Sequence, residues 1–576
     1  MPNVSISSPW AAFMRFSSTQ YRSWSSCSST MVSLACSLLC TALSLSFLTA
    51  FVASLALVDH KTPGSFGDRL LLGSYSSSKA STNFTAQLSG QNASTDAILQ
   101  GWVSGSEGRG TLDIIWSCLI TIFLCSWTVL CLNVPPSRWN NARLQWQKFL
   151  MMGLGVLGPE FVFQLAIAQW TSACRSVKAF HSLGHDKWTM THAFFADMGG
   201  FAFHTEDGVL FPLYSEQVLF LVEQGYVDAS DVIVDKSVIQ DKNKGDGMAR
   251  FLTIFQILWF SINSIGRVIQ RLAITTLELT TLGFIVCTLG TYFFWAHKPM
   301  DVSAAITLVP NIPLDEIIQR AGLNSQTSYK RTPLDFVGRN EWTSWMLYYT
   351  YWMNILRKLG IVFHPSRRPI EKISDDYTPA LSSSSLFILF VFHTSYAAVH
   401  ISGWNFHFPS QIEATIWHVA TITVMLAICG CWAADMWTWQ LWPSIKCLLS
   451  KPWGAANIIP LCSRGKEPTV YEETAQSSSV RRILSTSLAR HKIWIRSCLS
   501  YPQSIIQTAA SHLRNNSLDH DPDLTVPLKA ILPITLFAAS YTIARAYILI
   551  EDLVNLRSQP ASTFKTVNWS DFLPHF

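Results

Sequence analysis

The chain has 576 residues, of which 49% are hydrophobic and only 14% are charged. Soluble globular proteins carry about 25% charged residues, so this composition excludes an ordinary soluble domain and indicates a membrane protein. The formal net charge is +5 and the basic residues are spread over several loops, which excludes a nucleic-acid-binding protein. The 13 cysteines form no CxxC pair and no zinc spacing, so we predict neither a metal nor a cofactor.

The first 110 residues predict a membrane anchor followed by a lumenal loop. The apolar run at 31–58 is longer than the about 7 to 15 residues of a cleaved signal, so we interpret it as the first membrane span. The next segment, 59–110, is rich in Ser and Thr and holds glycosylation sequons at Asn83 and Asn92. A basic N-terminus before the span and sequons after it both place the loop in the lumen.

The segment 111–301 is predicted to form the core of a membrane bundle. It begins with a span at 112–132, and the short basic loop after that span is predicted to be cytosolic. The apolar stretch 149–170 is interrupted by glycines, Pro159 and Glu160, which break a helix and place a carboxylate at membrane depth. We predict that this stretch enters the membrane and returns to the same side. A full crossing is the alternative.

Five further apolar runs complete the predicted bundle. If 149–170 returns, the basic loops 302–385 and 436–527 are cytosolic, and the tail with its sequon at Asn568 is lumenal. A full crossing would place both basic loops in the lumen, against the charge rule. We therefore predict an all-α polytopic transmembrane bundle of about seven spans, within a range of six to eight. The five runs are 251–265, 272–295, 386–401, 414–434 and 528–549.

Two of the predicted loops contain too many regularly placed or clustered aromatic residues to be simple linkers. The polar loop 172–250 is rich in Trp, Phe and Tyr, so we expect it to pack against another part of the chain. Aromatic residues recur at three- and four-residue steps over 341–359, which predicts an amphipathic helix lying on the membrane surface. The predicted segments of the whole chain are 1–58, 59–110, 111–301, 302–385, 386–435, 436–527 and 528–576.

Several strings of residues resemble a large family of fungal integral membrane proteins, most of them uncharacterised. The resemblance covers most of 109–301 and two C-terminal pieces, and it implies a multi-span membrane protein. Some members are similar to the membrane-bound terpene and meroterpenoid cyclases of secondary metabolism, which implies cyclase activity by analogy. The strings are Arg109-Gly-Thr-Leu-Asp-Ile-Ile-Trp-Ser-Cys118, Gly158-Pro-Glu160, Lys187-Trp-Thr-Met-Thr-His-Ala-Phe-Phe-Ala-Asp-Met-Gly-Gly200, Lys244-Gly-Asp-Gly247, Gln270-Arg-Leu-Ala-Ile-Thr-Thr-Leu-Glu278, Trp295-Ala-His-Lys-Pro-Met-Asp301, Phe408-Pro-Ser-Gln-Ile-Glu413, Phe564-Lys-Thr-Val-Asn-Trp569 and Pro574-His-Phe576.

Ionisable residues inside the predicted spans are the sharpest local signal. A carboxylate at bilayer depth costs several kcal/mol unless it is paired, protonated or facing a cavity. Glu160 and Glu278, with Asp113 at a span entrance, are therefore the candidate catalytic acids, because a buried acid can protonate an epoxide or an alkene. The alternative is that the carboxylates only fix the bundle by pairing with basic residues. The candidate charge partners are Arg267, Arg271 and Arg545, with Arg109 as an i, i+4 partner of Asp113.

These observations predict a cofactor-free membrane-bound cyclase that protonates a prenylated or epoxidised lipophilic substrate. Its expected location is the endoplasmic reticulum or another secretory-pathway membrane. Its expected partners are the lipid bilayer, the substrate and other membrane-bound enzymes of the same pathway. The alternative is a non-enzymatic membrane protein, either a transporter or a scaffold. A cyclase needs a closed aromatic pocket around an unpaired acid, whereas a transporter needs a polar path across the bilayer.

Overall fold

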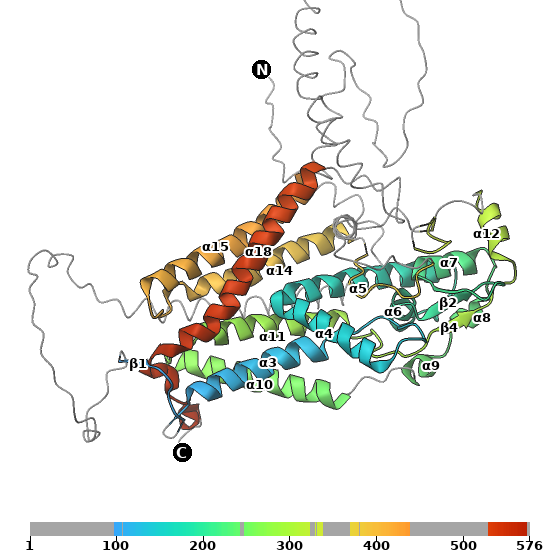
Figure 1. The fold of residues 1–576 in the computed structure, drawn as a ribbon. Helices are drawn as coiled ribbons and strands as arrows, with labels where there is room; N and C mark the ends of the chain where they lie inside the picture. Colours follow the sequence, from blue (N-terminus) through green and yellow to red (C-terminus); the bar gives the residue numbers. More distant parts are fainter. Residues whose placement is uncertain are drawn as a thin grey trace, which may run out of the picture. The chain divides into compact units, whose positions relative to one another are not determined.

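Figure 1 shows the computed structural model of the chain. The predicted first span at 31–58, the sequons at Asn83 and Asn92, and the predicted surface helix at 341–359 lie outside the residues that the structure describes. The described residues are 97–105, 108–241, 247–322, 329, 331–337, 369–379, 381–437 and 528–572.

The chain divides into two compact units. The second unit consists of residues 344–366 and 430–536, and its described part is limited to the adjoining ends of two long helices. Every contact discussed below lies within the first unit, which is made of 1–343, 367–429 and 537–576.

Within the described ranges, six helices are long and apolar enough to cross a membrane. Each begins and ends within a few residues of a predicted span, so the predicted helices after the first are confirmed as helices. Their apolar runs are long because a helix needs about 20 residues to cross the hydrocarbon core. The six helices are α3 (Thr111–Thr128), α10 (Gly247–Ile269), α11 (Thr276–Phe294), α14 (Ser383–Ser402), α15 (Gln411–Met436) and α18 (Leu528–Val554).

A bent pair of helices occupies the interrupted apolar stretch. Helix α4 (Asn141–Leu157) and helix α5 (Pro159–Ser182) turn by 110° at Gly158. Pro159 starts α5, where its missing N–H costs no helical hydrogen bond. Gly158 is required at the bend, because a Cβ atom there would lie 2.6 Å from the Phe161 ring. We call α4, Gly158 and α5 the hairpin.

Both helices of the hairpin contact one short segment. Gln147 near the middle of α4 donates to the Asp375 carboxylate over 2.6 Å, and Gln169 of α5 donates to the Tyr377 carbonyl over 3.3 Å. Figure 1 shows α4 and α5 both running from the bend toward the same end of the bundle. The middle turns of both helices therefore approach the same segment, and Gly158 at the tip is buried.

The aromatic loop between the hairpin and α10 forms a small packed domain. Its centre is a three-stranded sheet with the strand order β3 (Leu210–Pro212), β2 (Phe201–His204) and β4 (Ile306–Leu308). Strand β2 pairs antiparallel with β3 and parallel with β4. The prediction that this loop packs is confirmed, since its central Phe side chains are at most 1% exposed. We call this the sheet end of the bundle. Its short helices are α6 (Met190–Asp197), α7 (Ser215–Glu223), α8 (Ala229–Val232), α9 (Lys236–Asp241) and α12 (Leu314–Arg320).

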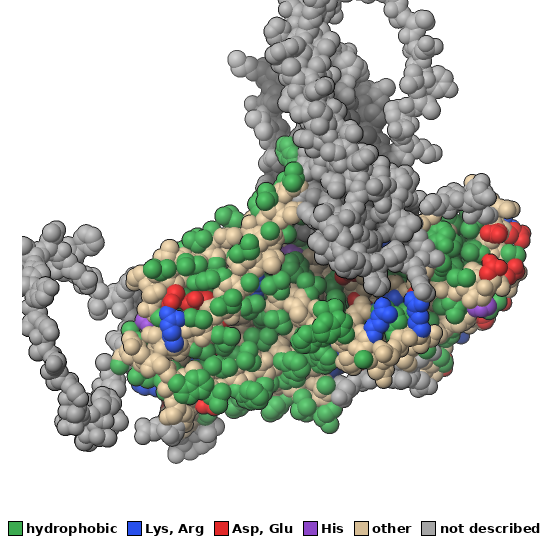
Figure 2. All heavy atoms as spheres, viewed as in Figure 1, with side chains coloured by type: hydrophobic (Ala, Val, Ile, Leu, Met, Phe, Trp, Pro, Cys, Tyr) green, Lys and Arg blue, Asp and Glu red, His purple; other side chains and the backbone are tan. Residues whose placement is uncertain are grey.

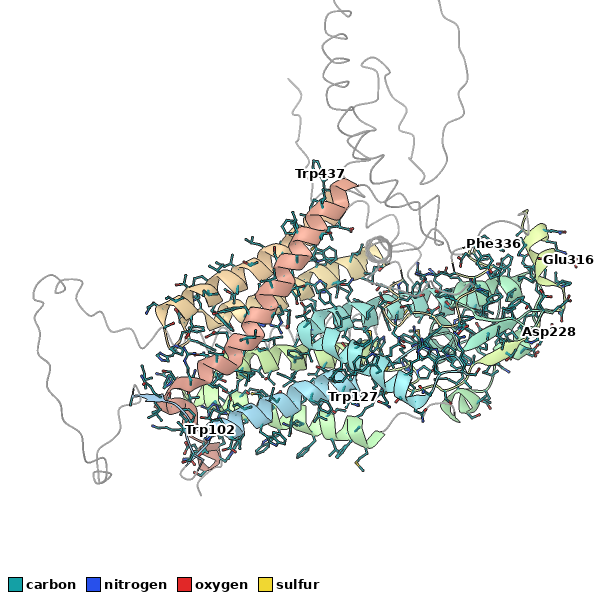
Figure 3. All side chains as sticks on the ribbon, in the orientation of Figure 1. Trp102, Trp127, Asp228, Glu316, Phe336 and Trp437 are labelled. Carbon is teal, nitrogen blue, oxygen red and sulfur yellow. The ribbon has the colours of Figure 1, made fainter. Side chains whose placement is uncertain are left out.

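The opposite end of the bundle is closed by the C-terminal tail. Strand β1 (Ile98–Gln100) pairs antiparallel with β5 (Ser558–Pro560), and the tail continues through η6 (Ala561–Phe564) and η7 (Trp569–Phe572). We call this the tail end. Figure 3 labels Trp102 at the tail end and Asp228 and Glu316 at the sheet end.

The side chains on the outside of the helices suit a lipid surface. In Figure 2 the helical part of the visible face is largely hydrophobic, and charged side chains lie toward its two ends. Helix α10 is the clearest case, because Phe255 and Trp259 are 60% and 52% exposed while Thr253 on the other face is buried. An exposed apolar surface of this kind is typical of a membrane-spanning helix.

Candidate functional site

Helix α18 presents a polar face to the inside of the bundle. Tyr541, Arg545 and Asp552 follow one another at steps of four and seven residues, so they share one side of the helix. Arg545 and Asp552 are both 0% exposed, and Tyr541 is 5% exposed. Charged side chains that are fully buried between apolar helices are costly and usually serve a function.

The Arg545 guanidinium is held by three groups from two other elements. It donates to His400 Nε2 over 2.5 Å and to the Tyr396 hydroxyl over 2.6 Å, both on α14, and to the Leu157 carbonyl over 3.2 Å at the hairpin tip. Because a guanidinium can only donate, His400 Nε2 must accept, so His400 is neutral with its proton on Nδ1. Arg545 thereby joins α18, α14 and the hairpin.

Glu160 lies at the hairpin tip, in the first turn of α5, and is 1% exposed. Its Oε1 accepts a hydrogen bond from the Tyr541 hydroxyl. Its Oε2 has no hydrogen-bond partner among the described residues. The N-terminal end of a helix carries a partial positive charge, which offsets part of the free-energy cost of burying this carboxylate. We call Glu160, Tyr396, His400, Tyr541 and Arg545 the tip cluster.

Glu278 is also buried, but both of its oxygens are occupied. Arg109 Nη1 lies 2.6 Å from Oε1, and Oε2 accepts from the backbone N–H and the hydroxyl of Thr275 over 2.9 and 3.0 Å. Thr275 Oγ1 in turn accepts from the Glu278 N–H, which completes a capping box at the start of α11. Glu278 therefore has the contacts of a structural residue, which joins the start of α11 to the segment before α3 through Arg109.

Asp113, the third predicted acid, lies on the exposed side of α3. Its Oδ2 accepts from the Gly110 N–H over 2.8 Å and so caps its own helix. The predicted pairing with Arg109 is not formed, because the Arg109 guanidinium bonds Glu278 instead. The structure does not bring Asp113 together with Glu160 or Glu278 in one site.

None of the three predicted arginine partners, Arg545 included, contacts a carboxylate at hydrogen-bond distance in the described chain. Arg267 is 1% exposed and donates to backbone carbonyls of Ala273 and of the tail, including Lys565 at 2.8 Å and Thr563 at 2.9 Å. It fastens the tail over the turn between α10 and α11. Arg271 is exposed in that turn, with a left-handed φ of 53°.

A narrow polar cavity at the sheet end was not predicted. Arg331 donates to the Tyr214 hydroxyl over 2.9 Å and stacks over the Tyr377 ring, with Ser172 and Asp197 also in the wall. Burial raises the pKa of the Asp197 carboxyl, although Ser215 N–H donates to it over 3.0 Å. The cavity has room for about one or two water molecules.

The inner face of α5 connects the tip cluster with this cavity. Gln164, Thr171 and Ser172 follow Glu160 along the helix and are 8%, 5% and 6% exposed. Thr171 Oγ1 lies 3.1 Å from the Ser385 hydroxyl of α14. Buried polar side chains thus extend from α18 through the tip cluster to the sheet end.

Comparison with known proteins gives a family without an assigned activity. Residues 82–329 and 502–576, more than half of the chain, match the model described as Family of unknown function (DUF8562). The chain belongs to this family. The matched segments contain the hairpin and α18, whereas α14 with Tyr396 and His400 lies outside them. No curated protein and no solved structure matches the chain.

Proposed function

We propose that this protein crosses the membrane seven times and translocates protons through its helical bundle. The topology combines six helices of membrane-spanning length with the predicted first span at 31–58. The hairpin adds no crossing in this proposal, which is supported by the contacts of Gln147 of α4 and Gln169 of α5 with the segment around Asp375 and Tyr377. The sheet end then faces the cytosol and the tail end faces the lumen of a secretory-pathway compartment.

The observation that carries the transport function is the meeting of two polar helix faces. Tyr541 of α18 donates to Glu160 of α5 at the hairpin tip. From this contact, the polar face of α18 extends about 16 Å to Asp552, toward the tail end. The polar face of α5 extends about 18 Å to Ser172, toward the sheet end. The two polar faces therefore lead from this contact toward opposite ends of the bundle (Figure 1).

The chemistry of the tip cluster suits the transfer of a proton. A carboxylate, a neutral imidazole and two phenol hydroxyls lie in two neighbouring sets of hydrogen bonds, one joining Tyr541 to Glu160 and one joining Arg545 to His400 and Tyr396. Arg545 supplies a fixed positive charge that compensates the negative charge of Glu160 when its proton leaves. Oε2 of Glu160, which has no hydrogen-bond partner in the described part of the chain, is the atom that would accept and release the proton.

The test is proton flux into liposomes that contain the purified full-length protein. A potassium gradient with valinomycin supplies the driving potential, and an enclosed pH dye reports the flux. Replacing Glu160→Gln removes the titratable oxygen and is expected to lower the flux at least tenfold. Glu316→Gln is the matched control, because it makes the same change on an exposed side chain at the sheet end. Flux no faster than in empty liposomes, or equal flux in both variants, would overturn the proposal.

Acid-catalysed cyclisation of a prenylated or epoxidised lipophilic substrate is the second candidate. The unpartnered Oε2 of Glu160 favours it, since a cyclase needs such an acid. Two observations place it second. The Tyr396 and Phe284 rings already face the Arg545 guanidinium at 5.5 and 5.8 Å. The cavity beside Asp197 and a second cavity beside Cys287 each have room for only about one or two waters.

The cyclase is tested with microsomes that contain the expressed protein, incubated with farnesylated phenols and their epoxides. Cyclisation by proton transfer conserves mass, so the product is an isomer of the substrate. An isomer that is lost in Glu160→Gln and kept in Glu316→Gln would place the cyclase first. Unchanged substrate with wild-type protein would exclude cyclisation of these compounds.

A further inference from the structure

A second group of buried oxygens lies at the tail end of α18. Asp552 and Asn555 are three residues apart, and Asp552 faces Thr276 and Thr280 of α11. Asp552 and Thr280 are 0% exposed, and Asn555 and Thr276 are 1% exposed. We call these four residues the oxygen cluster. It is separate from the tip cluster, because seven residues of α18, about 10 Å, lie between Arg545 and Asp552.

The oxygen cluster is short of donors. The Thr276 and Thr280 hydroxyls are the only donors in the described part of the chain that approach the Asp552 carboxylate, and neither reaches it with a well-formed hydrogen bond. Asn555 Oδ1 and Thr280 Oγ1 also have no hydrogen-bond partner there. The only contact that joins members within 3.5 Å is from Asn555 Nδ2 to Thr276 Oγ1, at the limit of 3.5 Å. Buried polar atoms nearly always have partners, so several unpartnered oxygens in one place point to a missing positive group.

The charges on the inner face of α18 point the same way. Glu160 and Asp552 contribute two negative charges, and Arg545 contributes one positive charge. The Arg545 N–H groups are directed to His400, Tyr396 and Leu157, and none of them bonds Asp552. Glu551, the neighbouring acid, is bonded instead by Tyr547. Glu551 is 4% exposed and its partner Tyr547 is neutral, so this buried set carries more negative than positive charge, and a bound cation would reduce the imbalance.

We propose that the oxygen cluster binds one monovalent cation, Na⁺. Carboxylate, amide and hydroxyl oxygens are ligands for hard cations, and together the four side chains offer five of them. A divalent ion would leave excess charge beside a single carboxylate in an apolar surrounding. The last turn of α18 favours a cation, because the C-terminal end of a helix carries a partial negative charge. Binding of the ion does not require proton translocation, and only a role of the ion in transport rests on the proposed function.

The test measures binding and needs no transport. The thermal unfolding of the purified full-length protein in detergent is followed by Trp fluorescence at constant ionic strength, while NaCl replaces choline chloride. A ligand that binds only the folded state raises the unfolding temperature in a saturable way. We expect such a rise for the wild-type protein, no rise for Asp552→Asn, and at least a tenfold higher midpoint concentration for Thr280→Val. Asp571→Asn, on an exposed residue of the tail, is expected to behave as the wild type.

A direct assay with ²²Na⁺ on the same proteins distinguishes loss of the site from loss of folding. Wild-type protein that binds ²²Na⁺, together with folded Asp552→Asn that does not, supports the proposal. Equal stabilisation by NaCl, KCl and choline chloride, or an unchanged response in Asp552→Asn, would overturn it. Because binding is measured in detergent, failure of proton flux in liposomes would leave this result unaffected, and the reverse also holds.

Discussion

Glu160 and Glu278 look alike in the sequence, since each is an acidic residue in an apolar stretch, but the structure places them in different surroundings. Each lies in the first turn of a helix and each is at most 2% exposed. Glu278 accepts hydrogen bonds from Thr275 and forms an ion pair with Arg109, so both of its carboxylate oxygens have partners. Among the described residues, the Glu160 carboxylate has one hydrogen bond, from Tyr541. The difference shows that burial alone does not identify a functional acid, because the supply of donors around it decides.

The largest expected effect concerns the buried ion pair. Glu278→Gln leaves the Arg109 guanidinium without its carboxylate, and breaking a buried pair on one side costs about 3–5 kcal/mol. Glu160→Gln keeps the hydrogen bond to Tyr541 and removes a poorly compensated charge, so we expect a change within about 1 kcal/mol. Denaturant titration in detergent micelles checks both values. Equal losses in the two variants would remove the distinction between the two carboxylates.

A control for this comparison removes both charges at once. Replacing Arg109 and Glu278 together with Met leaves no unpaired charge, and such replacements are often neutral or stabilising. We expect the double variant to be more stable than Glu278→Gln. A double variant that is less stable would show that the capping box, and not the ion pair, carries most of the stability.

The next effect concerns the bend that places Glu160 inside the bundle. Gly158→Ala would bring a Cβ atom within 2.6 Å of the Phe161 ring, and such overpacking typically costs about 1–3 kcal/mol. Gly153→Ala is the matched control, because a Cβ atom there meets nothing within 4 Å and α4 gains a better helix former. Thermal unfolding of the two variants should therefore shift in opposite directions. Two similar shifts would show that the tip is not tightly packed.

The smallest effect concerns the sheet end and is seen as a dependence on pH. Burial raises the pKa of Asp197 in the folded state, so the folded chain holds this proton more tightly than the unfolded chain. The stabilisation is complete below the usual pKa of 3.8 and is lost as the pH rises through the folded value. Asp197→Asn has no carboxyl group that titrates at this position, so its stability does not decrease for this reason as the pH rises. Unfolding temperatures from pH 4 to 8 should therefore fall further for the wild type, and parallel curves would contradict the raised pKa.

The bundle could be predicted largely from single stretches of sequence. The predicted spans at 272–295 and 414–434 correspond to α11 and α15, because apolar runs of this length have few alternatives to a helix. The break at Gly158 and Pro159 was predicted for the same local reason. The three-stranded sheet at the sheet end was not predicted, because its strands are only three or four residues long.

The candidate site was predicted only in part. Glu160 and Arg545 were identified because charged residues in apolar runs are conspicuous. Their partners were not, since Tyr541 is 381 residues from Glu160 and Arg545 is 145 residues from His400. Asp552 and Asn555 were also missed, although an acid near the end of the last apolar run is a usable signal. No local pattern tells which of several distant groups a buried charge will meet.

The sequence by itself determined the class of protein, the positions of the long helices and the interruption of one of them. These properties depend on hydrophobicity and on backbone geometry over about 20 neighbouring residues. Only the tertiary structure decided the 110° angle of the bend at Gly158 and the pairing of Arg109 with Glu278. It also left the Glu160 Oε2 atom without a hydrogen-bond partner among the described residues. Hydrogen bonds act over about 3 Å, so which donors reach a buried carboxylate depends on how distant helices pack together.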